Sequence, residues 1–261
     1  MRQIIASAFV SLDGVMQAPG GQDEDLSGGF RFGGWTAPYW DDAIAETMGD
    51  LFSAPFDLLL GRRTYDIFAG YWPQITDEAD PFSADIARVF NQATKYVATH
   101  HGETLAWQNS QWLGRDIIAR LRELKRTQGP VLLVQGSSTL MQQLLANDLV
   151  DELRLLTYPV LLGGGKRLFD DNAAPAAFTL AQSVVSPGGV IVAHYRRGDD
   201  RLLRGGKRGG NRDIKNSHRG DTAIHGRTDV YPSDTASIAF INPSRPSCAS
   251  IHCRTRQAAS A

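Results

Sequence analysis

Two glycine-led turns contain the residues best suited to bind an anion. The first consists of Gly61, Arg62, Arg63 and Thr64, which follow a short apolar run and open a stretch of helical character. Backbone N–H groups at a helix start, together with two adjacent guanidinium groups, would face a negatively charged ligand such as a phosphate or pyrophosphate. The alternative is an ordinary strand-to-helix turn with solvent-exposed arginines, and this motif alone does not decide between them.

The second turn follows another apolar run and consists of Gly136, Ser137, Ser138 and Thr139. An apolar helical stretch comes after it, so its N–H groups could bind an anion in the same way. Ser and Thr also favour the N-cap of any helix, and this alternative stays open. Two such turns at the carboxyl ends of parallel strands would mark the ligand position of an open α/β sheet. Neither turn matches the G-x-G-x-x-G or the Walker A pattern.

The elements that would position these turns alternate between strand and helix. Apolar and β-branched runs predict strands at residues 3–12, 56–60, 95–99, 130–134, 153–158, 178–185 and 190–195. Apolar residues at helical spacing predict helices at 40–52, from about 63, at 114–126 and at 140–145. The turn sequence at 186–189 joins the last two strands in a hairpin. We therefore expect an α/β fold with a mainly parallel sheet, helices on both faces and a C-terminal antiparallel hairpin.

Charge and composition change near residue 198. Residues 1–200 contain 16 Lys and Arg against 24 Asp and Glu, whereas residues 201–261 contain 11 against 4. The second region is rich in glycine and basic residues and has no amphipathic period, which is typical of disorder. We predict one folded domain at 1–198 and a basic, disordered tail at 199–261. The acidic folded part argues against nucleic acid as a partner.

Cysteine, histidine and hydropathy patterns narrow the class of protein further. Both cysteines, Cys248 and Cys253, lie in the tail, so the folded part depends on no disulfide or thiolate metal site. The six histidines show no metal-ligand spacing, and we assign no metal. The N-terminal apolar stretch is broken by Asp13 and is too short for a secretion signal or a membrane span. We expect a cytoplasmic protein that does not bind membranes.

Residues 17–38 are rich in glycine and acidic residues and lack apolar periodicity. A loop of this length in a compact domain is usually functional, and we interpret it as a mobile lid. Nearby aromatic residues are expected to pack in the core or the lid rather than to form a stacking site for a flat substrate. They are Trp35, Tyr39, Trp40, Tyr71 and Trp72.

Five segments, taken in order, resemble the dihydrofolate reductase superfamily. They are Ser11-Leu12-Asp13-Gly14, Gly61-Arg62-Arg63-Thr64-Tyr65, Val97-Ala98-Thr99, Gly136-Ser137, and Val150-Asp151-Glu152-Leu153 ahead of the run from Pro159 to Lys166. More closely, they look like the branch related to the C-terminal reductase domain of the bifunctional riboflavin biosynthesis deaminase-reductase. The resemblance covers residues 1 to about 197, and residues 150–169 are its most specific part.

The resemblance implies an NADPH site. Arg62, Arg63 and Thr64 would contact the pyrophosphate and the 2′-phosphate, since guanidinium groups favour a 2′-phosphate. Thr99 and His100 would lie beside the adenosine ribose phosphate. The full set assigned to the cofactor is Gly61, Arg62, Arg63, Thr64, Thr99, His100, Gly136, Ser137, Ser138, Thr139, Gly163 and Gly164. In dihydrofolate reductases the second turn is a Gly-Gly pair joined by a cis peptide, whereas this chain has Gly-Ser.

The implied reaction is hydride transfer from NADPH to a small, flat imine or carbonyl compound, similar to a pteridine or a ribitylated pyrimidine. The resemblance places Asp13 near the nicotinamide, where it could orient a substrate or relay a proton; alternatively it is only a turn residue before glycine. The first helix offers Asp41, Asp42 and Glu46 without a clear match to the helix carboxylate of dihydrofolate reductases, so dihydrofolate is not expected as a substrate.

Two further expectations concern activity and assembly. The alternative to an enzyme is a non-catalytic nucleotide-binding or regulatory protein that keeps the cofactor fold. Relatives of this kind resemble homodimers that pair through sheet edges and the late hairpin, so we also expect a homodimer.

Overall fold

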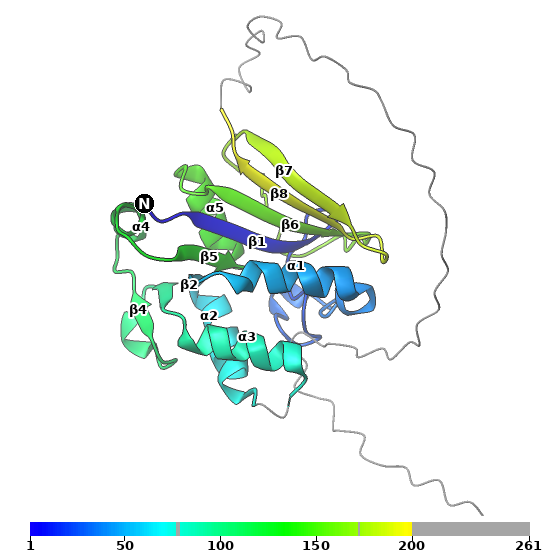
Figure 1. The fold of residues 1–261 in the computed structure, drawn as a ribbon, viewed down its shortest axis with the longest axis horizontal. Helices are drawn as coiled ribbons and strands as arrows, with labels where there is room; N and C mark the ends of the chain where they lie inside the picture. Colours follow the sequence, from blue (N-terminus) through cyan, green and yellow to red (C-terminus); the bar gives the residue numbers. More distant parts are fainter. Residues whose placement is uncertain (77–78, 172, 200–261) are drawn as a thin grey trace, which may run out of the picture.

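The computed structural model describes residues 1–76, 79–171 and 173–199, and Figure 1 shows them as one twisted sheet with helices packed against it. The strands lie in the order β4-β3-β2-β5-β1-β6-β8-β7. Their bounds are β1 Ile4–Ser11, β2 Phe56–Gly61, β3 Lys95–Ala98, β4 Ser110–Trp112, β5 Val131–Gln135, β6 Glu152–Tyr158, β7 Phe178–Val185 and β8 Ile191–Arg197. Pairing is parallel from β4 to β6 and antiparallel for β8 and β7. The predicted fold is confirmed.

Strand β1 lies inside the sheet because both of its faces are apolar. It pairs with β5, where Ile4 lies opposite Leu132, and with β6, where Ala6 lies opposite Leu153. Successive side chains of a strand point to opposite faces. Accordingly, Ile5 packs into one hydrophobic core while Ile4 and Ala6 pack into the other. Burial on both faces explains the near-continuous apolar sequence of this strand.

Helices cover both faces of the sheet (Figure 1). They are α1 Asp42–Ser53, α2 Arg62–Tyr71, α3 Pro81–Gln92, α4 Ile117–Arg126 and α5 Ser138–Ala146. On one face α1, α2 and α3 contribute Met48, Tyr65 and Phe90 to the core, and on the other α4 and α5 contribute Leu121 and Leu144. Helices α2 and α5 each follow a parallel strand directly, so their first turns lie together at the carboxyl edge of the sheet.

Aspartate caps set where the helices begin. Asp41 accepts a hydrogen bond from the N–H of Ile44 at 3.0 Å, and Asp116 accepts one from Ala119 at 2.9 Å. Because a capping residue lies outside the helix, α1 and α4 begin at residues 42 and 117 rather than at the predicted 40 and 114. Helix α3 and the short edge strand β4 were not predicted at all.

The C-terminal hairpin turns at residues 186–189 as predicted. Strand β8 lies between β6 and β7, so β7 forms one edge of the sheet. Several apolar side chains of this hairpin are exposed, namely Leu180, Val184, Val185 and Ile191. The predicted tail at 199–261 falls outside the described residues except for its first position. The domain boundary at 198 therefore stays a prediction.

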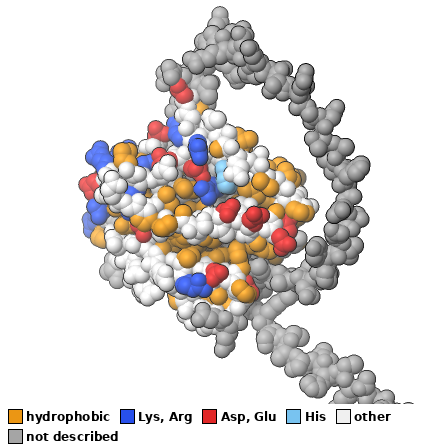
Figure 2. All heavy atoms as spheres, in the orientation of Figure 1, with side chains coloured by type: hydrophobic (Ala, Val, Ile, Leu, Met, Phe, Trp, Pro, Cys, Tyr) orange, Lys and Arg blue, Asp and Glu red, His pale blue; other side chains and the backbone are white. Residues whose placement is uncertain are grey.

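On the face shown in Figure 2, hydrophobic side chains are spread across the middle, and acidic and basic side chains lie among them and toward the edges. Within the described part of the chain, every helix is too short or too polar to cross a membrane.

Candidate functional site

A cavity of about 230 Å³ lies at the carboxyl ends of β1, β2 and β5. Its walls come from these strand ends, the first turns of α2 and α5, the inner side of α1 and the loop that follows β1. The polar lining consists of Gln17, Glu24, Asp25, Arg62, Arg63, Thr64, Gln135, Ser137, Ser138, Thr139 and Lys166, and the apolar lining includes Phe9, Met16, Met48, Phe52, Phe68, Trp72 and Phe90. Ligands of open α/β sheets bind at this position.

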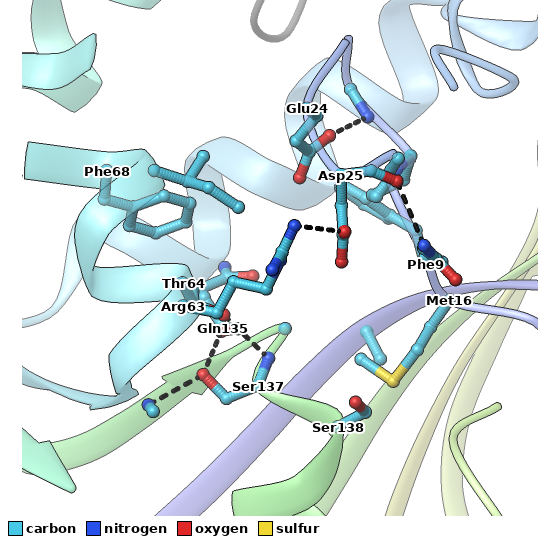
Figure 3. Close-up of a pocket in the computed structure, with 18 of the residues that line it drawn as sticks. Phe9, Met16, Glu24, Asp25, Arg63, Thr64, Phe68, Gln135, Ser137 and Ser138 are labelled. Carbon is cyan, nitrogen blue, oxygen red and sulfur yellow. Dashed lines mark hydrogen bonds and ion pairs between the residues drawn. The ribbon is translucent and has the colours of Figure 1, made fainter. Parts of the chain in front are cut away.

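The structure brings the two glycine-led turns together at this cavity (Figure 3). The N–H of Gly61 donates to Ser137 Oγ at 3.0 Å, and the N–H of Ser137 donates to Thr64 Oγ1 at 3.1 Å. Gly136 and Ser137 both have positive φ, +60° and +57°, so the chain turns sharply out of β5. The described residues contain no cis peptide bond.

Both helices at this junction begin without a side-chain cap. The first N–H groups of a helix have no partner within it, and they carry a partial positive charge. The first two residues of α5, Ser138 and Thr139, line the cavity, so the N-terminus of this helix faces it. The same lining contains Gln135, whose buried Nε2 has no hydrogen-bond partner among the described residues. The cavity therefore presents unsatisfied donors, as a site for an anion requires.

The two adjacent arginines diverge. Arg62 donates to Asp66 at 2.9 Å and to the carbonyl oxygen of His101 at 3.2 Å, so it lies toward the segment after β3. Arg63 instead pairs with Asp25 of the loop after β1 at 2.6 Å (Figure 3). Lys166 pairs with the other oxygen of Asp25, also at 2.6 Å. Burial acts to raise the pKa of Asp25, but its hydrogen bonds, chiefly from Lys166, outweigh burial and lower that pKa.

Residues 17–38 pack against the cavity as a hydrogen-bonded loop. The side chain of Gln17 donates to the carbonyl oxygens of Asp25 and Ser27, at 3.0 and 2.9 Å, and accepts from the N–H of Lys166 at 2.9 Å. Gly33 lies so close to the backbone of Gln22 that a Cβ atom would stand 2.3 Å from a carbonyl oxygen. The loop is thus anchored at several points, and its role as a moving lid stays a prediction.

Glu24 was not singled out from the sequence, although the loop was noted as acidic. One of its oxygens accepts hydrogen bonds from the N–H groups of Gly20 and Gly21, at 2.8 and 3.2 Å. Burial raises the pKa of Glu24, and the nearby charge of Asp25 raises it further. Two carboxyl groups at consecutive positions, Glu24 and Asp25, therefore have pKa values shifted in opposite directions. Such a divergence is typical of sites where carboxyl groups have different roles.

Asp13, Gly163 and Gly164 do not line this cavity. The carboxylate of Asp13 accepts hydrogen bonds from Ser11 Oγ at 2.6 Å and from the N–H groups of Leu162 and Gly163 at 3.2 and 2.8 Å. The Ser11 bond is the main cause of its lowered pKa. This placement favours the alternative in which Asp13 is a turn residue that ties the end of β1 to the loop after β6.

Thr99 and His100 also lie outside the cavity lining, directly after β3. Thr99 is buried, and its carbonyl oxygen accepts a hydrogen bond from Trp112 Nε1 at 2.7 Å. His100 is exposed, and Arg62 reaches toward this segment through the carbonyl oxygen of His101. Among the described residues, no group of three or more His, Cys, Asp or Glu side chains could hold a metal ion.

The aromatic residues pack as expected. Trp35 is buried, donates to the carbonyl oxygen of Gln17 at 2.9 Å and packs edge-on against Tyr158 with ring centroids 5.3 Å apart. Tyr39 also contacts Tyr158. Trp72 is buried in the core and contributes to the cavity wall.

Comparison with known proteins identifies the family. The family model for the RibD C-terminal domain matches residues 2–192. The chain belongs to this family. The protein YyaP of Bacillus subtilis (strain 168), named as uncharacterized, is 25% identical over 194 residues, which cover 74% of this chain and 94% of YyaP. This result confirms the branch that the sequence motifs indicated.

Two solved structures resemble the chain more distantly. A candidate riboflavin biosynthesis protein of Shewanella sp. PV-4 is 20% identical, with a TM-score of 0.50 over 76% of this chain and 99% of that one. A dihydrofolate reductase of Enterococcus faecalis in complex with NADP(H) is 14% identical, with a TM-score of 0.46 over 76% of this chain and 97% of that one. The first of these supports the fold.

Proposed function

We propose that the protein is an NADPH-dependent reductase that transfers a hydride to a small, flat heterocyclic imine or carbonyl compound, similar to a pteridine or a ribitylated pyrimidine. The observation that carries the proposal is the convergence of two uncapped helix N-termini, those of α2 and α5, on one cavity. Unsatisfied N–H groups favour phosphate oxygens. Membership of the RibD C-terminal domain family supports reduction as the activity.

The polar part of the site fits the phosphates of a dinucleotide. The pyrophosphate would lie on the first turns of α2 and α5, where Thr64 and Ser137 already form one hydrogen-bonded junction. Arg62 is oriented toward the segment after β3, and it would place a 2′-phosphate near Thr99 and His100. When bound, the dihydronicotinamide supplies the hydride, and the protein supplies binding, orientation and a proton route.

The apolar part of the cavity suits a flat substrate. Phe9, Phe52 and Phe68 lie on its walls, with Met48 from α1. The carboxylates at the first helix, Asp41, Asp42 and Glu46, are not in the lining. Asp41 instead caps α1 and accepts from the N–H of Gly188 at 3.0 Å. This arrangement supports the expectation that dihydrofolate is not the substrate.

The proposal is tested by measuring binding and turnover on the intact protein. NADPH and NADH affinities are measured by fluorescence, and NADPH oxidation is followed with a panel of pteridines, quinones and ribitylated pyrimidines. We expect NADPH to bind and at least one compound to be reduced above the blank. Binding without any turnover would favour the alternative, a non-catalytic nucleotide-binding protein. Absence of binding to either nucleotide would refute both.

The expected homodimer belongs to this proposal too. The exposed apolar side chains of the terminal hairpin, among them Leu180, Val185 and Ile191, would be covered by a second copy of this chain. Light scattering of the wild type should give the mass of a dimer, and the variant V185D should shift the mass toward the monomer. A monomeric wild type would contradict this part.

A further inference from the structure

Glu24 stands apart from the other charged groups of the cavity. Arg63 and Lys166 are both paired with Asp25, and Arg62 is paired with Asp66. No basic side chain among the described residues forms an ion pair with Glu24. A carboxyl group that is neither compensated by a cation nor fully hydrated resists ionisation. Glu24 is therefore the one ionisable side chain of the lining that forms no ion pair among the described residues.

The geometry fixes Glu24 over the cavity. Its Oε2 accepts from the N–H groups of Gly20 and Gly21, at 2.8 and 3.2 Å, and Oε1 has no hydrogen-bond partner among the described residues. Figure 3 shows one carboxyl oxygen directed at the backbone and the other turned into the cavity. The apolar lining of the same cavity includes Phe68 from α2 and Phe9 from β1. One oxygen is thus held and the other is presented to a ligand.

We propose that Glu24 is the acid of this site and protonates the nitrogen of an imine, or the oxygen of a carbonyl, in the bound substrate. The inference rests on the proposed reductase function. The substrate carbon would take a hydride, which a bound dihydronicotinamide would supply as it is oxidised. The carbon–heteroatom π bond breaks, and the heteroatom takes the proton from Glu24 Oε1. The resulting carboxylate regains a proton from solvent, because the side chain is only partly buried.

The surroundings favour the protonated form of Glu24 without preventing its ionisation. The charged groups that share the cavity lining with it are Asp25 on its own loop, Arg62 and Arg63 on α2 and Lys166 after β6. Arg62 is neutralised by Asp66, and Arg63 and Lys166 are both engaged by Asp25, so the last three together carry a charge of only about one unit. The backbone N–H groups of Gly20 and Gly21 remain to stabilise the carboxylate after transfer. A general acid needs this balance, with a pKa moved toward the working pH.

The test does not require the substrate, because the pKa of an acid beside the nicotinamide ring must depend on the charge of that ring. Carbon-13 NMR titration of the glutamate carboxyl groups is performed on the free protein and on its complexes with NADPH and NADP⁺. The variant E24Q assigns the Glu24 signal, and D23N, at an exposed neighbour in the same loop, is the matched control. We expect the pKa of Glu24 to be lower with NADP⁺ than with NADPH, by roughly one pKa unit, since a positive ring charge close by favours the carboxylate.

The titration separates the proposed role of Glu24 from the proposed reductase function. An equal pKa of Glu24 in the two complexes, with both nucleotides bound, would overturn the proposal while leaving the reductase function intact. Failure of both nucleotides to bind would refute the function itself and the inference with it. For any compound of the panel that is reduced, the rate should fall as pH rises through the measured pKa of Glu24. E24Q should lose this pH dependence while NADPH affinity stays within about twofold; an unchanged pH profile in E24Q would also overturn the proposal.

Discussion

The buried lysine at the start of β3 gives the sharpest prediction for stability. Lys95 is fully buried, its ammonium group donates to the carbonyl oxygen of Asn91 at 2.8 Å, and it lies 4.3 Å from the ring centroid of Trp107. Burial lowers the pKa of Lys95 from 10.5 to about 8. The hydrogen bond and the ring both favour the ammonium form, so the cost of desolvation exceeds what they provide.

The sign and size of the effect follow from the difference in protonation between folded and unfolded chains. From about pH 8 to about pH 10.5 the unfolded lysine still holds a proton that the folded one has lost. The free energy of unfolding therefore rises with pH through this window. One pKa unit corresponds to about 1.4 kcal/mol, so the full gain for Lys95 is roughly 3 kcal/mol. Below about pH 8 both states carry the charge, and this gain is absent.

The variant K95M removes the titrating group and keeps a similar side-chain length. Its stability advantage over the wild type should shrink by roughly 3 kcal/mol between about pH 7.5 and about pH 10.5. Urea unfolding followed by tryptophan fluorescence measures this difference at several pH values. K95R, which stays charged throughout, should follow the pH profile of K95M at lower stability. A constant difference between the wild type and K95M across the window would refute the reasoning.

Three further predictions concern the site and the chain end. Replacing Arg62 and Arg63 by Ala should weaken NADPH binding far more than NADH binding. R62A alone should cause most of the loss of about 1.5 to 3 kcal/mol, because Arg62 is directed toward the segment after β3, where the 2′-phosphate would lie, whereas Arg63 is directed toward Asp25. Equal losses for both nucleotides, or a similar loss in the control R120A, would contradict this. Dihydrofolate should be reduced at no more than trace rates and methotrexate should bind weakly, and tight methotrexate binding in a fluorescence titration would overturn this expectation. The fragment 1–199 should match the intact chain in thermal midpoint and NADPH affinity, whereas a midpoint lower by several degrees would place the boundary elsewhere.

The regular elements were predictable where one physical signal dominated. Strands buried on both faces, such as β2 and β5, are short apolar runs between turn residues, and their positions were predicted to within a residue or two. Helix α3 was missed although Asp80 and Pro81 form a typical helix start and Ile86 and Phe90 recur at helical spacing. Strand β4 has only three residues and is mostly exposed, so no apolar pattern marks it.

The site was predictable only in the parts that follow strands. Two turns after parallel strands must meet at one edge of the sheet, and Gly61 and Ser137 do so. The directions of Arg62 and Arg63 depend on partners far along the chain, which no local pattern reveals. The position of Glu24 could not be predicted for the same reason, since it is set by how residues 17–38 fold back over the cavity.

That loop joins the anion site to the substrate side of the cavity through a single carboxylate. Asp25 holds Arg63 and Lys166 with bonds of equal length, and Gln17 secures both the loop and the N–H of Lys166. A phosphate placed at α2 would compete with Asp25 for Arg63, because each offers the guanidinium a charge-assisted hydrogen bond of similar strength. Binding at the phosphate end is therefore coupled physically to the position of the segment that carries Glu24. The acidic loop thus balances the cations around the cavity through Asp25, and Glu24 forms no ion pair among the described residues.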